Sequence, residues 1–331
     1  MLILNATDVR KALPMSQAIE AMKQAFAALT DGRAIVPRRT HLPIARNAGI
    51  SLIMPSFVDD ADPHAQALAV KVVSLFDHNQ ARGLARIQAA VVVIEPDTGR
   101  PIALLEGATL TAIRTAAASG AATDLMARQD SRRLALFGAG VQARTHLEAM
   151  CAVRPIETAW IYCRTPAKVE ALIAELSERP GINARLIAAT SPQQCLQDAD
   201  IVCATTTSKV PIFNDADLKP GVHINAIGSY TPLAREVPPE TVQRARIVVD
   251  SREAAWEEAG DLIQPLNAGL ITRDHVSSEL GELVLGRKPG HNNNREITFF
   301  KSVGIAVQDA AAGRIALENA RRLGMGQSVE W

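Results

Sequence analysis

A glycine-rich turn separates a short apolar run from an apolar helix pattern in the middle of the chain. Residues 134–137 are followed by Gly138-Ala-Gly140-Val141-Gln142-Ala143, which has the form Gly-x-Gly-x-x-Ala. In a strand-turn-helix unit the first glycine allows the tight turn, Gly140 lets bare backbone approach a phosphate, and Ala143 lets the helix pack closely on its strand. The positive end of the helix then meets the anion. The turn predicts a dinucleotide site, although the same spacing also occurs in tight turns without a ligand.

The end of the next apolar run bears on which dinucleotide is bound. An enzyme selective for NAD places an Asp or Glu there to hold the ribose hydroxyls. This chain has Arg164 and Thr165 after Cys163, with Lys168 close behind. A guanidinium and a hydroxyl suit a 2′-phosphate, so NADPH is preferred and NADH is the alternative. Arg164 could also be an ordinary exposed loop arginine.

Three cations outside this region stand in unusual places. Lys71 lies within the apolar run Ala69-Val-Lys71-Val-Val, Arg39 follows Val36-Pro-Arg, and Arg114 begins a stretch of small residues. A buried, unpaired lysine is costly, so Lys71 calls for an anion. Each cation alone could be solvated or salt-bridged. Together they indicate a substrate that carries a carboxylate.

Two patterns surround these residues. In the first third, a helix pattern at 16–29 precedes short apolar runs divided by turn residues, which predicts a helix with an antiparallel-rich sheet. From residue 134 strands alternate with helices, which predicts a doubly wound parallel sheet. The tail, residues 299–323, reads as one long helix that returns to the first domain.

A length of 331 residues favours two domains. We expect an α/β protein with a Rossmann domain at residues 114–303. A second, α+β domain is expected from residues 1–113 and 304–331.

Charge and cysteine usage exclude several function classes. Lys plus Arg and Asp plus Glu both number 35, which removes the general electrostatic case for nucleic acid or an anionic membrane. The four cysteines form no C-x-x-C pair and the histidines do not cluster, so no metal site is expected. No apolar run reaches membrane-spanning length, and no leader segment is evident. We expect a soluble, cytoplasmic protein.

Longer motifs resemble those of the ornithine cyclodeaminase and mu-crystallin family, in the same order and over essentially the whole chain. They are Met54-Pro55, Val70-Lys71-Val72, Leu110-Thr-Ala-Ile-Arg114-Thr115-Ala-Ala-Ala-Ser119, Phe137-Gly-Ala-Gly-Val-Gln142-Ala143, Val248-Val-Asp250-Ser251-Arg252, Glu279-Leu-Gly281-Glu and Ile297-Thr-Phe-Phe-Lys301-Ser302-Val-Gly304. The resemblance implies a Rossmann domain and a substrate and dimerisation domain built from both chain ends, which pairs in a homodimer.

The resemblance also implies roles for individual residues. It assigns the substrate to Arg39, Lys71 and Arg114, with Met54 and Tyr230 beside them. It assigns the cofactor, in addition to the residues after Cys163, to Thr115, Gly138, Gly140, Val141, Gln142, Ala143, Thr205, Thr206, Gly228, Ser229 and Lys301, the last near the nicotinamide.

Two departures distinguish this chain from ornithine cyclodeaminases. Tyr230 stands where those enzymes have an aspartate that handles the substrate amine, and Leu52 stands where they have a second acid. A site that manages ammonia release should not lack both acids, so ornithine cyclisation is disfavoured.

The resemblance then favours the branch that reduces cyclic ketimines: Δ1-pyrroline-2-carboxylate to L-proline, and Δ1-piperideine-2-carboxylate to L-pipecolate. Arg114 would clamp the carboxylate with two bonds, Arg39 would assist, and Lys71 or water would protonate the ring nitrogen. The alternatives are an alanine dehydrogenase-like or opine-type enzyme, an ornithine cyclodeaminase, and a small-ligand-binding protein that uses NADPH, as mu-crystallin does.

Overall fold

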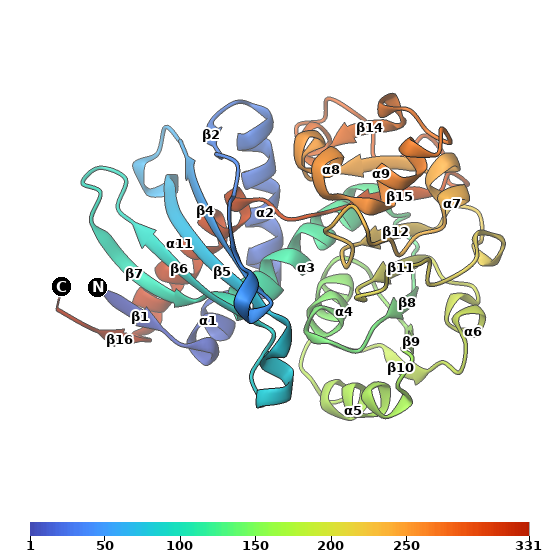
Figure 1. Cartoon of the computed structure of the whole chain (residues 1–331), viewed down its shortest axis with the longest axis horizontal. Helices are drawn as coiled ribbons and strands as arrows, with labels where there is room; N and C mark the ends of the chain where they lie inside the picture. The colour runs from blue at the N-terminus through green and yellow to red at the C-terminus, as the bar shows by residue number, and fades with distance from the viewer. Residues whose placement is uncertain (331) are drawn as a thin grey trace. The chain divides into compact units, whose positions relative to one another are not determined.

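The computed structural model describes residues 1–330, and the chain divides into two compact units. The first is formed by Met1–Arg114 together with the segment that begins at Ile305, and the second by Thr115–Gly304. In Figure 1 the first unit carries both the blue and the red ends of the chain.

The first unit is built on a mixed sheet in the order β16-β1-β7-β6-β5-β4-β2, with β3 paired to β4. Neighbouring strands are antiparallel except for β1 and β7, which are parallel. The strands are β1 (Leu2–Leu4), β2 (Ala34–Ile35), β3 (Thr40–Ile44), β4 (Gly49–Val58), β5 (Ala67–Phe76), β6 (Ile87–Ile94), β7 (Pro101–Glu106) and β16 (Gln327–Ser328). Since β1 and β16 come from opposite ends of the chain, the predicted joining of the two ends in one domain is confirmed.

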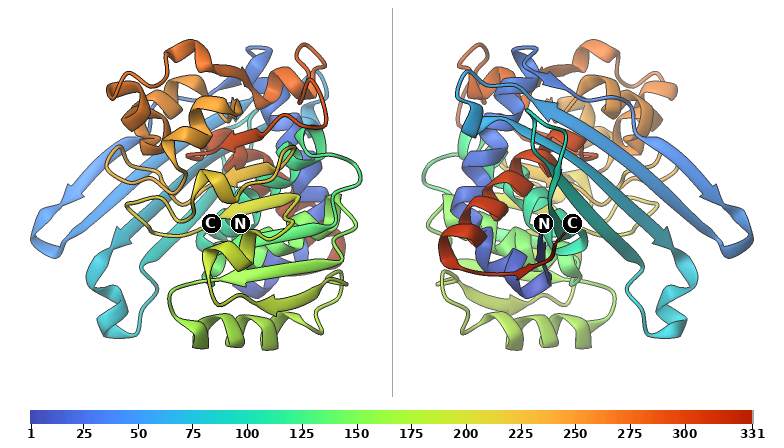
Figure 2. Two further views of the ribbon diagram at one scale, coloured as in Figure 1. Left: turned by 90° about the vertical axis from the view of Figure 1, so that its right-hand side faces the viewer. Right: turned by 90° about the vertical axis from the view of Figure 1, so that its left-hand side faces the viewer.

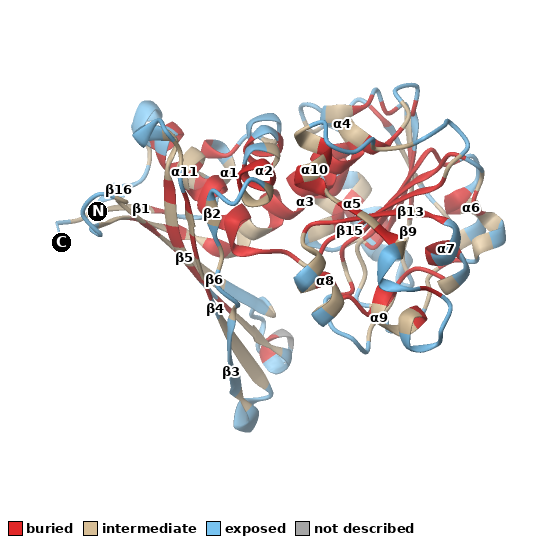
Figure 3. Ribbon diagram, turned by 90° about the horizontal axis from the view of Figure 1, so that it is seen from above, coloured by how far each residue is buried: buried red, intermediate tan, exposed pale blue. Residues whose placement is uncertain are grey.

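Helices cover one face of this sheet. α11 (Ala306–Leu323) packs on β4, β5 and β6 and against α2 (Met15–Thr30), and the short α1 (Ala6–Ala12) lies beside α11. Figure 2 shows the red helix α11 along these strands. Because side chains alternate between the two faces of a strand, Met54 and Lys71 point to the helices and are buried, whereas Ile53 and Val72 point outward and are exposed. Figure 3 shows buried residues where these strands lie beside the helices and exposed residues along β3.

The second unit is an eight-stranded sheet in which every pair is parallel, in the order β10-β9-β8-β11-β12-β15-β13-β14. Its strands are β8 (Arg133–Phe137), β9 (Thr158–Tyr162), β10 (Arg185–Ala188), β11 (Ile201–Ala204), β12 (His223–Ala226), β13 (Arg246–Val249), β14 (Val276–Glu279) and β15 (Thr298–Lys301). Its helices are the later part of α3 (Gly107–Met126), α4 (Val141–Val153), α5 (Pro166–Leu176), α6 (Pro192–Leu196), α7 (Pro239–Arg244), α8 (Arg252–Glu258), α9 (Gly260–Asn267) and α10 (Leu280–Val284). The doubly wound parallel sheet is confirmed.

The order of these strands marks a place for a ligand. From β8 the chain moves outward through β9 and β10, and it then returns to the other side of β8 with β11 and β12. In open α/β sheets, ligands bind beyond the carboxyl ends of the strands where the order reverses. Here that point lies at the ends of β8 and β11.

The predicted tail helix is wrong over its first residues. Thr298–Lys301 form β15, which lies between β12 and β13, and α11 begins only at Ala306. The four residues of β15, Thr-Phe-Phe-Lys, are too few to show a period that separates a buried strand from a helix.

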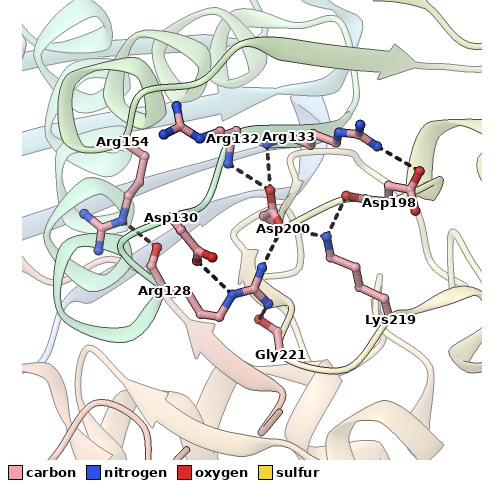
Figure 4. Close-up of polar contacts among 9 residues, drawn as sticks. All are labelled: Arg128, Asp130, Arg132, Arg133, Arg154, Asp198, Asp200, Lys219 and Gly221. Carbon is pink, nitrogen blue, oxygen red and sulfur yellow. Dashed lines mark hydrogen bonds and ion pairs between the residues drawn. The ribbon is translucent and has the colours of Figure 1, made fainter. Parts of the chain in front are cut away.

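Asp200 joins the amino ends of the central strands (Figure 4). It precedes β11 and accepts hydrogen bonds from the backbone N–H groups of Arg132 and Arg133 at 2.8 and 2.9 Å, where β8 begins. Its other oxygen contacts Arg128 at 2.8 Å and Lys219 at 2.6 Å. The cluster fixes the end of the sheet opposite to the glycine-rich turn.

Within residues 1–330, we find no helix whose length and hydropathy would let it cross a membrane.

Candidate active site

Three charged side chains meet on the helix-covered face of the mixed sheet, and all three are buried. Lys71 comes from the middle of β5, Arg114 from α3 and Asp309 from the first turn of α11. The Lys71 Nζ lies 2.7 Å from Asp309 Oδ2, and the Arg114 Nε lies 3.0 Å from Asp309 Oδ1. One carboxylate therefore bridges two of the cations that the sequence singles out.

The start of α11 holds this cluster in place. Gln308 accepts a hydrogen bond from Arg114 Nη1 at 2.6 Å, and the same oxygen accepts one from the N–H of Ile305 at 3.0 Å. Ser56 donates to the carbonyl of Ala306 at 2.8 Å, which ties β4 to the helix. The guanidinium of Arg114 is thus oriented before any ligand binds.

Burial and the neighbouring charges shift the pKa of Lys71. Burial lowers the pKa of Lys71 to about 8, with the nearby Arg114 and Arg39 acting in the same direction and Asp309 opposing them. A lysine with such a pKa carries its proton at neutral pH and can release it more readily than an exposed lysine.

The other predicted substrate residues have different surroundings. Arg39 lies between β2 and β3 and is partly exposed, and its charge reaches Lys71. Met54 pairs with Lys71 across β4 and β5 but is buried in a small apolar cluster with Val73, so it borders the cations through packing. Tyr230 is 37% exposed in a loop of the second unit.

Sequence reasoning missed Asp309 and Gln308. They lie in the stretch Ala306-Val-Gln-Asp-Ala-Ala-Ala, which reads as the ordinary start of a helix with an acid in its first turn. The signal that could have found them was Lys71 in an apolar strand that contains no acid. A buried ammonium requires a counter-charge from the protein as well as from a ligand.

In the second unit, the glycine-rich turn has the geometry that a dinucleotide requires. Gly138 has a φ of +111°, and a Cβ there would lie 2.8 Å from the carbonyl oxygen of Thr205. α4 begins after Gly140, which leaves its first N–H groups without a side-chain cap. Ala143 is fully buried where α4 meets the sheet. Open N–H groups at a helix start and bare backbone at Gly140 fit a pyrophosphate.

The rest of the turn and the end of β9 are open to a ligand. Val141 is exposed, Gln142 is partly buried, and Arg164, Thr165 and Lys168 are all exposed just beyond β9. Among the described residues, Arg164 has no ion pair or side-chain hydrogen bond. It therefore presents its guanidinium to solvent at the position that the sequence predicts to select between the two dinucleotides.

The ends of β11 and β12 supply the remaining predicted cofactor residues. Thr205 donates to the carbonyl of Phe137 through both its N–H, at 2.9 Å, and its hydroxyl, at 2.8 Å. Thr206 and Gly228 lie two residues past their strands, and Ser229 is buried and donates to the carbonyl of Ala234. Thr115 is buried on α3.

Lys301 lies in a polar cluster of its own. Its ammonium is fully buried, 3.0 Å from Asp261, and it donates to the carbonyls of Ala226 at 3.2 Å and Ser229 at 2.5 Å. The ammonium thus has two hydrogen-bond acceptors and one ion-pair partner in the protein. The place of Lys301 near the nicotinamide stays a prediction, and these contacts hold its ammonium at the ends of β12 and β15.

Across residues 1–330, no three His, Cys, Asp or Glu side chains gather in a way that could hold a metal ion.

Comparisons with known proteins show the family of the chain. The profile of the ornithine cyclodeaminase/mu-crystallin family matches residues 1–323. A Δ1-pyrroline-2-carboxylate reductase of Bacillus cereus is 38% identical over 332 residues, with 100% of both chains covered.

Two solved structures extend the comparison. The chain is similar to the Δ1-pyrroline-2-carboxylate reductase of Thermococcus litoralis in complex with NADH and L-proline, with a TM-score of 0.94 and 41% identity over 99% of this chain and 100% of that one. It is also similar to an archaeal alanine dehydrogenase dimer with bound NAD, with a TM-score of 0.91 and 28% identity over 100% and 99% of the two chains.

Proposed function

The chain belongs to the ornithine cyclodeaminase/mu-crystallin family, and we propose that it is a NAD(P)H-dependent reductase that converts Δ1-pyrroline-2-carboxylate to L-proline. The observation that carries this proposal is the buried cluster of Lys71, Arg114 and Asp309. It offers a carboxylate-binding cation beside a lysine that can donate a proton. Relatives named for this reaction match over the full chain, which supports it.

The first unit supplies the substrate residues. Because Asp309 and Gln308 occupy Nε and Nη1 of Arg114, Nη2 remains for a substrate carboxylate, and Arg39 is the second cation. Arg114 is thus expected to form the predicted two-bond clamp without its Nε. Together, Lys71, Arg114 and Asp309 carry one net positive charge, which a single carboxylate neutralises.

Lys71 acts on the ring nitrogen. A reduced nicotinamide, when bound, supplies the hydride to C2 of the imine, and the nitrogen must then hold a proton. Lys71 is protonated at neutral pH, and its pKa of about 8, set mainly by burial, makes it a competent donor. Asp309 then remains paired with Arg114, so no buried charge is left alone.

The second unit supplies the cofactor residues. Gly138, Gly140 and the start of α4 take the pyrophosphate, and Arg164 with Thr165 and Lys168 take the 2′-phosphate, which gives a preference for NADPH over NADH. Relatives have been solved with NADH and with NAD. We therefore also expect this chain to bind the cofactor that lacks the 2′-phosphate.

We also propose a homodimer that pairs through the outer face of the mixed sheet. The apolar side chains Ile53 and Val72 are paired on this face and exposed. A relative has been solved as a dimer.

The absence of acids at Leu52 and Tyr230 argues against ornithine cyclisation, and the likeness to alanine dehydrogenases makes an open-chain substrate the second candidate. The test follows oxidation of NADPH and of NADH with Δ1-pyrroline-2-carboxylate, with Δ1-piperideine-2-carboxylate, and with pyruvate plus ammonia, beside NAD reduction with ornithine. Fast oxidation with the five-membered imine is expected. Turnover only with pyruvate and ammonia would establish the second candidate, and cofactor binding without any turnover would indicate a ligand-binding protein.

A further inference from the structure

Glu236 has a fully buried carboxylate whose two oxygens bind backbone groups of two different loops. Its Oε1 accepts a hydrogen bond from the N–H of Thr206 at 2.6 Å, and its Oε2 accepts one from the N–H of Gly228 at 2.7 Å. Charge-assisted bonds of this kind are stronger than neutral ones. The side chain thus joins two segments that are far apart in the chain.

The two N–H groups occupy equivalent places in the sheet. β11 and β12 are adjacent and parallel with Ala204 opposite Ala226, and the ladder ends where the N–H of Ile227 meets the carbonyl of Ala204 at 3.0 Å. Thr206 and Gly228 each follow two residues beyond their strand. The carboxylate therefore bridges the strands directly after their own hydrogen bonds stop.

The space at this point is shaped for the carboxylate. A Cβ on Gly228 would lie 2.7 Å from both oxygens of Glu236 and 1.9 Å from the carbonyl oxygen of Thr206. Only a glycine lets the two loops and the carboxylate come this close. This explains the glycine without any direct contact with a ligand.

Contacts with Asp261 and Lys301 hold Glu236 in position. Asp261 Oδ1 accepts from the backbone N–H of Glu236 at 2.6 Å, and Asp261 Oδ2 pairs with Lys301 at 3.0 Å. Lys301 donates to the carbonyl of Ser229, next to Gly228, at 2.5 Å. These contacts form a closed ring that runs back to the loop that Glu236 holds.

The carboxylate of Glu236 and the two N–H groups that it binds form a clamp between the two loops. This Glu236 clamp is connected to the glycine-rich turn through Thr205, the neighbour of Thr206. Thr205 binds the carbonyl of Phe137 with its N–H and its hydroxyl, and it packs where a Cβ on Gly138 would fall. A movement of Thr206 would therefore be transmitted to the turn.

We propose that Glu236 is a positioning residue for the dinucleotide, which holds the loops after β11 and β12 in the arrangement that receives the cofactor. This inference rests on the proposed NAD(P)H site at the same strand ends. Nothing in the sequence pointed to Glu236, because a lone acid in a loop has no periodic or motif signature.

The pKa of the Glu236 carboxyl allows a second measurement of its role. Burial, followed by Asp261, raises the pKa of Glu236 to about 7, while Lys301 and the N–H of Thr206 oppose this rise. A protonated carboxyl places an O–H where one of the two N–H groups needs an acceptor. Cofactor affinity should therefore fall as the pH drops through 7, and by reciprocity cofactor binding should release a proton near that pH.

The test compares Glu236→Gln with Asp200→Asn. Both variants turn a buried carboxylate that accepts two backbone N–H groups into an amide, but Asp200 lies at the amino ends of the strands. NADH fluorescence titrations, without substrate, are run well below both unfolding temperatures. We expect the NADH Kd of Glu236→Gln to rise about tenfold or more, and that of Asp200→Asn to stay within about twofold of the wild type. The KM for the imine should change less than the KM for NADH.

Each outcome decides a different point. An unchanged Kd in Glu236→Gln, or an equal loss in both variants, overturns the inference. Wild-type protein that binds no NADH overturns the proposed function itself. If Glu236→Gln does not fold, the wild type is titrated with NADH from about pH 6 to about pH 9. Weaker binding and proton release on the acid side support the clamp, and a flat Kd overturns it.

Discussion

Asp309 lies between two buried cations, with one oxygen 2.7 Å from Lys71 and the other 3.0 Å from Arg114. Without it, two positive charges would be confined with no counter-charge, at a cost of several kcal/mol. With it, the pair keeps one net positive charge for a substrate carboxylate. Asp309 also opposes the effect of burial on Lys71, so it helps to set when Lys71 gives up its proton.

The alkaline limb of the pH profile should report Lys71. Since burial lowers the pKa of Lys71 to about 8, Lys71 loses its proton above that pH and can no longer act as an acid. We expect kcat/KM for imine reduction to fall above about pH 8 in the wild type. Lys71→Met should lower kcat/KM by about 100-fold to 10,000-fold and remove this limb, while the NADH Kd stays unchanged. An alkaline limb that persists in Lys71→Met would assign it to another group.

Asp309→Asn should move the same limb to lower pH, because the carboxylate holds the pKa of Lys71 up against burial and Arg114. The direction of this shift in pH follows from the loss of a negative charge beside Lys71, and a loss of packing alone would not produce it. Glu318→Gln is the matched control, since Glu318 lies on the same helix but pairs only with Arg314 at the surface. The pH dependence of kcat/KM for all three proteins checks this, and a limb at the same pH in Asp309→Asn would refute it.

At the scale of elements, the two ends of the parallel strands have different tasks. The carboxyl ends of β8, β9, β11 and β12 lead into the predicted cofactor residues. The amino ends of β8 and β11 are joined by Asp200, with Arg128 and Lys219 beside it. Mutations at one end should therefore alter cofactor binding, and mutations at the other should alter stability.

Arg164 follows β9 and is exposed, so its charge is available for a 2′-phosphate. Arg164→Ala should raise the KM for NADPH by an amount equivalent to about 1 to 3 kcal/mol and leave the KM for NADH nearly unchanged. Arg185→Ala, an exposed arginine at the amino end of the neighbouring β10, should change neither. Equal losses for both cofactors in Arg164→Ala would reject the assignment.

Asp200 should contribute stability that depends on pH. Burial alone would raise the pKa of Asp200, but Lys219 and the N–H groups of Arg132 and Arg133 outweigh it, so the pKa is lowered from its ordinary value. This contribution is complete above the unfolded pKa of about 3.9 and is lost as the pH falls through the folded value. Asp200→Asn should lower the free energy of unfolding by about 1 to 3 kcal/mol at neutral pH.

The difference between Asp200→Asn and the wild type should shrink toward acid pH in denaturant titrations. Asp198→Asn is the control, because the side chain of Asp198 forms only an exposed pair with Arg133 and its left-handed backbone, with a φ of 57°, tolerates asparagine. The backbone carbonyl of Asp198 accepts from Lys219 at 2.8 Å, and this bond does not depend on the side chain. It should change stability by less than about 0.5 kcal/mol. A pH-independent loss in Asp200→Asn would show that charge is not the cause.

At the scale of the whole molecule, α1, α2 and α11 pack on one face of the mixed sheet. Its other face presents apolar side chains on adjacent strands, such as Leu42 on β3, Ile53 on β4 and Val72 on β5. Contiguous exposed apolar patches on a protein usually mark an interface.

The mass in solution tests the proposed homodimer. Light scattering at micromolar concentration should give twice the chain mass of 35.4 kDa. Val72→Glu places a charge on the outer sheet face and should produce a monomer, because an unpaired charge buried in an interface is costly. Val210→Glu, at an equally apolar exposed position in the second unit, should leave the dimer intact. A monomeric wild type would count against the interface.

The sequence alone determined the parts that rest on local patterns. The spacing of Gly138, Gly140 and Ala143 predicted the strand-turn-helix unit, because each position has its own steric requirement. The alternation of apolar runs and helices predicted the parallel sheet, and the oddly placed Lys71 and Arg114 predicted a charged site. Roles near the cofactor remain predictions, because they depend on a ligand.

Only the tertiary structure decided which distant residues complete these sites. Asp309 lies 195 positions after Arg114 and becomes its partner because α11 returns to cover the sheet. Glu236 and Lys301 bind backbone groups of other loops, and such contacts leave no mark in a sequence. Strand β15 was hidden for a similar reason, since its four residues are buried on both faces and have no period. Local patterns specify elements, whereas the counter-charges and clamps depend on which elements the fold brings together.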